Sequence, residues 1–344
     1  MTHTKMASDN ASAGVFVQFV LNNFPIVVFA VFVGVGYFFW KRYSDNGDGG
    51  YKSGERLDGK TVIITGANKG TGKETARALA AKGARVILAC RDITKADAAA
   101  SDIRQTTGNG NVVVEELNLA SLASIRKFAA KIKKRETSLD ILINNAAVSA
   151  CSKWVTEDGF DRQFATNHLG HFLLTNLLLD LLKTSAPSRV IIVSAVLYKR
   201  GKINFDDING EKSYSPHGAY CQSMLASVLF MRELARRLEG TGVTANALHP
   251  GVVSTELSRN FSTTLGWIML LLGPFFTAWV YLFAKTAKQG AQTTVRLAVD
   301  KELETTSGAY FSDCKPHELA PVGKDDVTAR KLWHVSEEMV GLTG

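Results

Sequence analysis

From Lys60 onward, short runs of β-branched and aliphatic residues alternate with longer amphipathic stretches. The runs TVIIT, RVILAC, NVVVEEL, LDILINN, RVIIVS and VTANALH have the length and composition of buried strands. The intervening stretches ETARALAAKG, Thr94–Thr107, SIRKFAAKIKKRE and MLASVLFMRELARRLEG have helical periodicity. Strands and helices that alternate at this length form a parallel sheet with helices on both faces. We therefore predict one doubly wound, Rossmann-type α/β domain over residues 60–344.

The N-terminal part contains an apolar run that is long enough to cross a bilayer. No residue from 11 to 40 is charged, and about 20 apolar residues in a helix match a hydrocarbon core of ~30 Å. Lys41 and Arg42 follow directly, whereas only Lys5 precedes the run. The positive-inside bias then places the C-terminal domain in the cytosol. We predict a single-pass anchor at about residues 20–40, with a cleaved signal peptide as the alternative.

Two further segments have distinct compositions. The anchor segment ends at about residue 43, and residues 44–59 form a linker rich in glycine and charge. Residues 260–284 carry no charge. A second span is one interpretation, but a Gly-Pro pair would break its helix, and the C-terminal residues would lie across the membrane from their own sheet. We expect instead an apolar lid at about residues 255–285, over the active site.

Overall charge and cysteine spacing disfavour several classes of protein. The net charge of +8 includes no basic run interleaved with aromatic residues, so nucleic-acid binding is not expected. The excess of positive charge is compatible with a solvated surface or with attraction to anionic lipid headgroups. The four cysteines are widely spaced, without a CxxC pair, which predicts neither disulfides nor zinc and favours a reducing compartment. We expect the protein to lie in the endoplasmic reticulum membrane. A mitochondrial membrane is the alternative, although no arginine precedes the anchor, as a mitochondrial targeting segment would require.

A glycine-rich turn follows the first predicted strand of the domain. TVIITGANKGTGKETARALA places Gly66, Gly70 and Gly72 between that strand and a helix. Glycines at such a turn permit a tight bend and let a pyrophosphate approach the backbone at the helix N-terminus. Strand, turn and helix come in the order that a βαβ nucleotide-binding unit requires. The turn therefore predicts a dinucleotide site.

The TGxxxGxG spacing and four later motifs resemble the short-chain dehydrogenase/reductase superfamily. The motifs are LINNAAV, NHLGHF, HPGVVSTEL and GAYFSDCK. Together with the N-terminal anchor, they are most similar to membrane-bound retinol dehydrogenases, and the resemblance runs from about Asp58 to the C-terminus. It implies helices at Asp158–Leu182 and Tyr220–Leu238, which form a dimer face in many relatives. The expected partners are therefore a membrane, a lipophilic retinoid-like substrate, and a homo- or heterodimer partner.

The resemblance also implies a set of cofactor-binding residues. They are Gly66, Ala67, Asn68, Lys69, Gly70, Thr71, Gly72, Arg91, Asn118, Leu119, Asn145, Ala146, Pro250, Gly251, Val253 and Thr255. An acidic residue after the second strand would bind the ribose of NAD. This chain has Arg91 there and Lys69 in the glycine turn, which favours the 2′-phosphate of NADP(H), with Asp92 pointing past the ribose. Two solvated surface charges are the alternative.

Two positions in this set of motifs depart from the pattern of the superfamily. Asn118 replaces an aspartate that holds the adenine, although an amide still accepts that hydrogen bond. Ala147 replaces the last glycine of NNAG, and we expect its methyl group to crowd the cofactor or to require an unfavourable backbone angle.

The resemblance further implies four catalytic groups, of which two are replaced. Tyr220 and Asn167 match the tyrosine and the asparagine, but the lysine position holds Met224 and the second serine of a VSS pair reads Ala195. Tyrosine titrates near pH ~10, and the lysine would lower its pKa and hold the nicotinamide ribose. Strand alternation should turn Ser194 to the face opposite Ala195, so we do not expect Ser194 to replace the missing serine.

Other groups near the tyrosine are weaker candidates. Lys199, Lys202 and Lys212 lie in the loop before the tyrosine helix, but none has the fixed i, i+4 relation to Tyr220. His168 and His171, three residues apart, are too few for a metal site and should pack beneath the cofactor. We expect His249, before the Pro-Gly turn, to be structural.

Three hypotheses about function remain open. In the first hypothesis, the chain is an NADP(H)-dependent oxidoreductase with weakened activity, and its substrates are lipophilic alcohols and aldehydes such as retinol and retinal. Alternatively, it is a pseudoenzyme that binds NADP(H) and acts as a binder, a sensor or a partner of an active relative. The third hypothesis is a membrane-surface interaction protein with a vestigial pocket. Whether it is an enzyme depends on what surrounds Tyr220.

Overall fold

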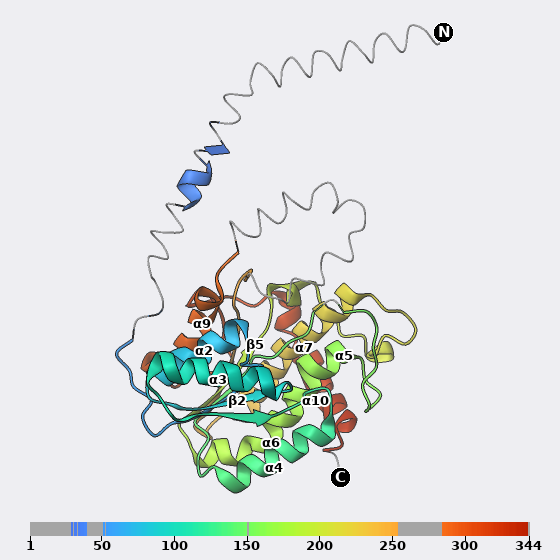
Figure 1. Cartoon of the computed structure of the whole chain (residues 1–344). Helices are drawn as coiled ribbons and strands as arrows, with labels where there is room; N and C mark the ends of the chain where they lie inside the picture. Colours follow the sequence, from blue (N-terminus) through green and yellow to red (C-terminus); the bar gives the residue numbers. More distant parts are fainter. Residues whose placement is uncertain are drawn as a thin grey trace. The chain divides into compact units, whose positions relative to one another are not determined.

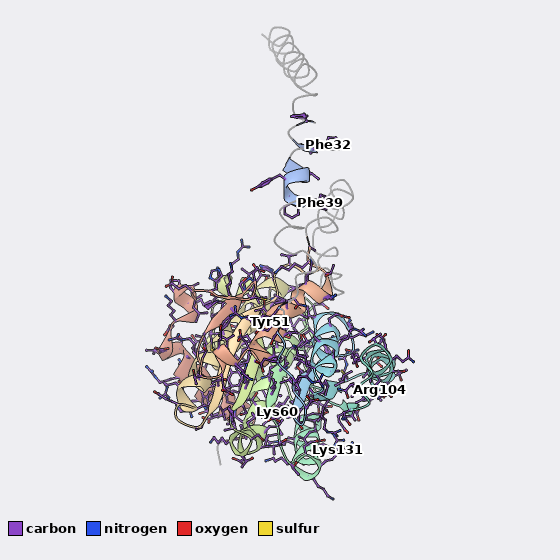
Figure 2. The ribbon with its side chains drawn as sticks, turned by 90° about the vertical axis from the view of Figure 1, so that its left-hand side faces the viewer. Phe32, Phe39, Tyr51, Lys60, Arg104 and Lys131 are labelled. Carbon is purple, nitrogen blue, oxygen red and sulfur yellow. The ribbon has the colours of Figure 1, made fainter. Side chains whose placement is uncertain are left out.

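A computed structural model of the protein describes residues 29, 31–32, 34–39, 51, 53–149, 151–253 and 284–342. The chain divides into two compact units, Met1–Gly50 and Tyr51–Gly344. In the first, residues 34–39 are helical, and the side chains of Phe32 and Phe39 are 71% and 42% exposed (Figure 2). No helix within these described ranges is long and apolar enough to cross a bilayer. Most of the predicted anchor, and almost all of the predicted lid, lie outside the described residues.

The second unit is built on one eight-stranded sheet with the order β3-β2-β1-β4-β5-β6-β7-β8. Neighbouring strands run parallel except β7 and β8, which are antiparallel. The strands are β1 (Thr61–Thr65), β2 (Arg85–Cys90), β3 (Val112–Glu116), β4 (Ile141–Asn144), β5 (Ser188–Val193), β6 (Val243–His249), β7 (Tyr310–Ser312) and β8 (Lys315–Pro316). All six predicted strands are confirmed. β7 lies in the GAYFSDCK motif and β8 begins at its last residue; neither was predicted as a strand.

The helices confirm the predicted alternation and add two elements at the C-terminal end. They are α2 (Gly70–Ala81), α3 (Ile93–Thr107), α4 (Leu122–Arg135), α5 (Arg162–Phe164), α6 (Gly170–Thr184), α7 (Pro216–Arg237), α9 (Ala287–Val299) and α10 (Asp326–Met339). The predicted helix beginning at Met224 starts two turns earlier, because Ser215 caps the Gly218 N–H and Pro216 occupies the first turn. Neither α9 nor α10 was predicted.

Side-chain alternation along the strands gives the sheet two buried faces. In β1, Val62 and Ile64 join a hydrophobic cluster with α2, α3 and α9, while Ile63 joins a second cluster with α4, α6 and α7. All three side chains are fully buried. Figure 1 shows α2, α3 and α9 on one side of the sheet and α4 and α6 on the other. This confirms the predicted doubly wound α/β fold.

Helix α10 packs over α6 and α7. The Trp333 ring lies 4.9 Å from the ring of Phe172 and 5.8 Å from that of Phe230, centroid to centroid. Ser336 contacts Nε2 of His168 at 2.8 Å, and the Arg237 guanidinium lies 4.2 Å from the Trp333 ring. The pair α6 and α7 is the face that the resemblance assigned to a dimer. A dimer at this face stays a prediction. Because α10 covers part of α6 and α7, α10 would contribute to such an interface.

Candidate active site

A cavity of ≈ 670 Å³ lies at the carboxyl ends of β1, β4, β5 and β6. In a doubly wound sheet, ligands bind at this edge, where the strand order reverses. Here the reversal lies between β1 and β4. The cavity is lined by Gly66, Asn68, Lys69, Gly70, Thr71, Asn145, Ala146, Ala147, Ser149, Val193, Ser194, Ala195, Leu197, Tyr220, Met224, Pro250, Gly251, Val252, Val253 and Ala287. The glycine turn and the tyrosine therefore share one cavity.

The glycine turn is packed too tightly for side chains. A Cβ atom added at Gly72 would lie 2.5 Å from Nδ2 of Asn145 and 2.8 Å from the carbonyl oxygen of Gly66. Gly66 itself has φ +67°, in the left-handed region that favours glycine. The Asn145 amide donates to the Thr65 carbonyl at 2.8 Å and holds the ends of β1 and β4 together. This packing keeps the backbone close to the cavity, as a bound pyrophosphate requires.

The start of α2 has the features of an anion site. Lys69 occupies the N-cap position in extended conformation, and no side chain caps the helix. The first backbone N–H groups of a helix carry partial positive charge and bind phosphate readily. Gly70 and Thr71 at this helix start line the cavity, and uncapped N–H groups at that place fit the pyrophosphate of a dinucleotide.

Charges after β2 distinguish the two nicotinamide cofactors. Arg91 follows β2 and is exposed. The Asp92 carboxylate caps α3 by accepting from the Lys95 N–H at 3.1 Å, and it pairs with the Lys95 ammonium at 2.9 Å. The Asp92 carboxylate is thus engaged by the first turn of its own helix, and the position directly after β2 holds a base instead of an acid. The chain's residues therefore fit NADP(H) rather than NAD(H).

Removing the two basic side chains tests this selection. We expect Lys69→Ala/Arg91→Ala to weaken NADPH binding about 10- to 100-fold, since a hydrogen bond to a charged group contributes about 1.5–3 kcal/mol. NADH affinity should stay within about 2-fold, because NADH lacks the 2′-phosphate. Titration of cofactor fluorescence measures both values. Lys134→Ala, at an exposed position of α4, controls for the loss of positive charge, and equal losses for both cofactors would contradict the assignment.

Several predicted cofactor residues lie away from the cavity wall. Ala67, Gly72, Arg91, Asn118 and Leu119 do not line it. The Asn118 side chain accepts from the Ala120 N–H at 3.2 Å and thus stabilises its own turn. Thr255 lies outside the described residues. The roles of these side chains in cofactor binding stay predictions.

The expectation of an unfavourable backbone angle at Ala147 was wrong. Among the described non-glycine residues, only Asp313 and Cys314 have positive φ. Ala147 follows the end of β4 in ordinary conformation and places its methyl group in the cavity wall. Crowding of the cofactor by that methyl group stays a prediction.

Tyr220 lies on the second turn of α7 and is 6% exposed. Burial raises the pKa of its hydroxyl to about 12, with a smaller contribution from the Cys221 thiol. Met224, one turn later, is 2% exposed and lines the same cavity. The thioether carries no charge and leaves the tyrosine in an apolar setting. Tyr220 is therefore protonated near neutral pH, able to donate a proton but not to accept one.

Ser194 does not take the place of the missing serine, as the sequence predicted. The assigned strand ends at Val193, but the Ser194 N–H still donates to the Leu248 carbonyl at 2.7 Å and Ala195 is still extended. The Ser194 hydroxyl donates to the Met224 carbonyl at 3.0 Å. Because that donor is engaged by α7, Ser194 does not supply the hydrogen bond that a serine at position 195 would make.

Asn167 lies in a π-helical turn, Ala165–Leu169, between α5 and α6. Such turns often mark functional positions in helices. Its amide donates to the Val148 carbonyl at 2.9 Å and accepts from the Val148 N–H at 2.8 Å. The amide also donates to the Ser223 hydroxyl on α7 at 2.9 Å. Asn167 thereby ties the segment after β4 to the tyrosine helix, although it does not itself line the cavity.

The histidines are structural. His171 contacts the Thr65 hydroxyl at 2.9 Å, directly beside the glycine turn. His168 instead packs towards Ser336 of α10, so the expectation that it lies beneath the cofactor was wrong. Burial lowers the pKa of His168 to about 3 and that of His171 to about 4. His249 contacts the Tyr310 hydroxyl at 3.0 Å, consistent with a structural role.

The loop lysines do not replace the missing ammonium. Lys212 donates to the Asp206 carbonyl at 3.1 Å, and Lys199 and Lys202 are exposed. None of the three lines the described part of the cavity. The pKa of Tyr220 is raised by burial without an offsetting cation among the described residues.

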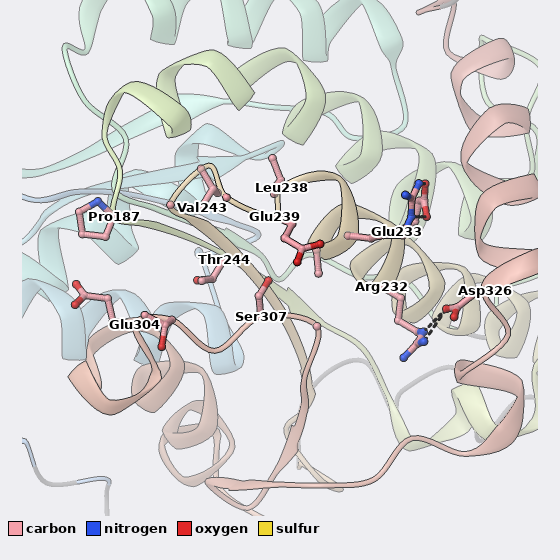
Figure 3. A pocket seen from close by; sticks show the side chains of 16 residues that line it. Pro187, Arg232, Glu233, Leu238, Glu239, Val243, Thr244, Glu304, Ser307 and Asp326 are labelled. Atoms are coloured by element: carbon pink, nitrogen blue, oxygen red, sulfur yellow. Dashed lines mark hydrogen bonds and ion pairs between the residues drawn. The ribbon is translucent and has the colours of Figure 1, made fainter.

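A second cavity of ≈ 680 Å³ lies at the amino end of β6 (Figure 3). Arg232 pairs with Asp326 at 2.6 Å, and Glu233 pairs with Arg236 at 2.6 Å, so these charges on its wall are neutralised. It contains neither the glycine turn nor the tyrosine. Because dinucleotides bind at the carboxyl ends of such strands, the first cavity is the candidate active site.

Comparisons with known proteins agree with this geometry. The family model for short chain dehydrogenases matches residues 60–266. Retinol dehydrogenase 14 from Homo sapiens is 52% identical over 299 residues, covering 83% of this chain and 88% of that protein. Retinol dehydrogenase 13 from Homo sapiens is 53% identical over 294 residues, covering 83% and 86%. A solved structure of an uncharacterized protein from Mycobacterium Paratuberculosis is 36% identical, with a TM-score of 0.68, covering 85% of this chain and 98% of that one. The chain therefore belongs to the short chain dehydrogenase family and is similar to retinol dehydrogenases.

Proposed function

We propose that this protein is a membrane-associated, NADP(H)-dependent oxidoreductase that reduces retinoid-like aldehydes faster than it oxidises the alcohols. The observation that carries the proposal is the single cavity shared by the glycine turn and Tyr220. Relatives more than 50% identical are named retinol dehydrogenases, which favours a retinoid. The apolar side chains of Val193, Leu197 and Met224 in the cavity wall suit a hydrocarbon chain.

The preferred direction follows from the protonation of Tyr220. When bound, NADPH would supply the hydride for the aldehyde carbon. The oxygen then becomes an alkoxide and takes the proton that Tyr220 holds at neutral pH. Oxidation would need a deprotonated Tyr220, and burial disfavours that state because it raises the pKa to about 12. The missing lysine therefore slows oxidation more than reduction.

Tyr220→Phe tests whether the protein is a catalyst. We expect this variant to lose about 10²-fold or more of the retinal reduction rate with NADPH, because a positioned proton donor typically contributes that factor. NADPH affinity should be unchanged. Tyr51→Phe, whose ring lies beside Arg296 of α9, is the matched control and should retain the wild-type rate. Membranes that carry the protein are the appropriate sample, with retinol formation measured by chromatography.

A pseudoenzyme is the second candidate, and the pairing of Met224 with Ala195 in the cavity wall favours it. In that case the protein would still bind NADP(H) and would act as a binder, a sensor or a partner of an active relative. Wild-type turnover equal to that of Tyr220→Phe, together with normal NADPH affinity, would decide for this candidate. Loss of nucleotide binding in the wild type would leave only an interaction protein.

We further propose that the N-terminal apolar run anchors the domain to the endoplasmic reticulum membrane on its cytosolic face. The uncharged stretch from residue 11 to residue 40 and the basic pair Lys41-Arg42 support this orientation. Among the described residues of that stretch, the aromatic side chains of Phe29 and Phe32 are 70% and 71% exposed. Homo- or heterodimer formation is part of the same proposal. Protease treatment of intact microsomes should degrade the domain.

A further inference from the structure

The GAYFSDCK motif contains a two-residue turn with an unusual backbone. Asp313 and Cys314 connect β7 to β8, because Ser312 and Lys315 are paired neighbours in these strands. Their φ angles are +49° and +58°, and no other described non-glycine residue has positive φ. A type I′ hairpin turn needs positive φ at both positions and usually has Asn-Gly or Asp-Gly there. Cys314 thus occupies a position that favours glycine, and such strained backbone persists only where the surrounding structure holds it.

Helix α9 holds this turn in place. The Cys314 N–H donates to the Thr293 hydroxyl at 3.0 Å, and the Arg296 guanidinium donates to the Cys314 carbonyl. Both partners lie on α9. The turn presents the Asp313 carboxylate to the Lys285 ammonium, with which it forms an ion pair. Because Lys285 directly precedes the N-cap residue of α9, this ion pair joins the hairpin to the start of the helix.

Lys285 lies against the backbone that follows β6 in the cavity wall. A Cβ atom added at Gly251 would lie 3.1 Å from Nζ and 3.2 Å from Cε of Lys285, so the lysine side chain crosses this glycine. The Lys285 N–H donates to the Val252 carbonyl at 2.8 Å, and Lys285 pairs with Val253 in a parallel bridge. Residues 250–253 all line the cavity, whereas Lys285 is not part of its described lining. Lys285 therefore supports this part of the wall from behind.

The order of the strands indicates which part of the cofactor this wall would face. Arg91 follows β2, and the glycine turn follows β1, so the 2′-phosphate and the pyrophosphate of NADP(H) belong on that side of the sheet. The nicotinamide is at the opposite end of the dinucleotide and has to come within reach of Tyr220. Helix α7, which carries Tyr220, packs against β5 and β6. The wall after β6 is therefore expected beside the nicotinamide end.

We infer that Lys285 and Asp313 are positioning residues for the nicotinamide end of NADP(H). The Asp313 carboxylate holds the Lys285 ammonium over Gly251, and the lysine in turn fixes the wall formed by residues 250–253. The inference deepens the proposed function and rests only on its NADP(H)-binding part. The Asp313 side chain is 67% exposed, and an exposed ion pair contributes little to the stability of a fold. Loss of the pair should therefore affect cofactor binding more than folding.

Two single variants and a truncated ligand test this role. Lys285→Met keeps the aliphatic stem and removes the ammonium. Asp313→Asn removes the negative charge and keeps a residue type that tolerates positive φ. Each should weaken NADPH binding about 3- to 10-fold, the contribution of one net hydrogen bond. 2′-Phospho-ADP-ribose, which lacks the nicotinamide, should bind within about 2-fold of the wild-type affinity, because its binding energy includes no nicotinamide contacts. Titration calorimetry measures both ligands.

A double variant and a matched control complete the experiment. Lys285→Met/Asp313→Asn should be weaker than either single variant by no more than about 2-fold, because both changes remove the same pair. Lys324→Met, which removes an exposed ion pair with Glu318, should leave both affinities unchanged.

The two ligands also separate this inference from the proposed function. Equal losses for NADPH and 2′-phospho-ADP-ribose would overturn it, because the pair would then only support the fold. Unchanged NADPH affinity in both single variants, with turnover that depends on Tyr220, would reject the positioning role alone. A selective loss of NADPH affinity in a protein without such turnover would reject the proposed oxidoreductase and support the positioning role.

Discussion

Ala195→Ser/Met224→Lys is expected to raise the rate of retinol oxidation with NADP⁺ about 10²- to 10⁴-fold. A tuned acid/base contributes a factor of this size, and a lysine one helical turn after Tyr220 would lower its pKa from about 12 towards neutrality. The gain should be smaller for reduction, because the protonated tyrosine already serves that direction. Steady-state kinetics in both directions measure the difference.

The dependence on pH identifies the cause of the gain. In the wild type, oxidation should keep rising as the pH approaches 10, because the base form of Tyr220 is still scarce below a pKa of about 12. In the double variant, the rate should level off at a lower pH. Both proteins must be compared within the pH range in which thermal denaturation shows them folded. A gain in rate with an unchanged pH profile would show that the lysine acts through the ribose and not through the tyrosine.

The single variants separate the two contributions. Met224→Lys alone should provide most of the gain in oxidation, because it lowers the pKa of Tyr220. Ala195→Ser alone should give a smaller gain, because it supplies a donor for the substrate oxygen but leaves Tyr220 without a nearby cation. Because Met224 is 2% exposed, the buried lysine will lower stability unless bound NADP(H) compensates for its desolvation. No gain in any of the three variants, with cofactor bound normally, would mean that the cavity no longer accepts the substrate.

Gly72→Ala is expected to weaken NADPH binding about 5- to 100-fold and to destabilise the fold by about 1–3 kcal/mol. The added methyl carbon would lie 2.5 Å from Nδ2 of Asn145 and 2.8 Å from the Gly66 carbonyl oxygen, so one of them has to move. Moving Asn145 breaks its hydrogen bond to the Thr65 carbonyl, and moving Gly66 shifts the turn that faces the cavity. Cofactor titration and thermal denaturation measure the two effects.

Gly110→Ala is the matched control for this prediction. Gly110 has no atom within 4 Å of an added Cβ and does not have positive φ, so the substitution should be neutral within about 0.5 kcal/mol. If Gly72→Ala behaves like Gly110→Ala, the glycine turn is less tightly packed than the contacts indicate. Its role as a pyrophosphate cradle would then be wrong.

The sequence by itself determined the α/β class, the strands and the glycine turn. These features depend on local information. The period at which apolar residues recur distinguishes a strand from a helix, and a glycine-rich turn between a strand and a helix is typical of a nucleotide site. Ala195 and Met224 could also be recognised as replacements of the family's serine and lysine, because the motifs around them match the family closely. The C-terminal elements α9 and α10 were missed. Both begin at capping residues, Thr286 for α9 and Asp325 for α10, and this local signal could have revealed them.

Only the tertiary structure decided how the catalytic positions relate to one another. Alternation along β5 predicted that Ser194 would not replace the missing serine, and the structure adds the reason, because the Ser194 hydroxyl donates to the Met224 carbonyl. Burial of Tyr220 in the folded domain raises its pKa to about 12, and the spacing of residues does not report burial. The hydrogen bonds of Asn167 to Val148, almost twenty positions away in the chain, were not predicted from the sequence. Such contacts form between segments that are far apart in the chain, whereas a sequence pattern reports only on residues that are close together in it.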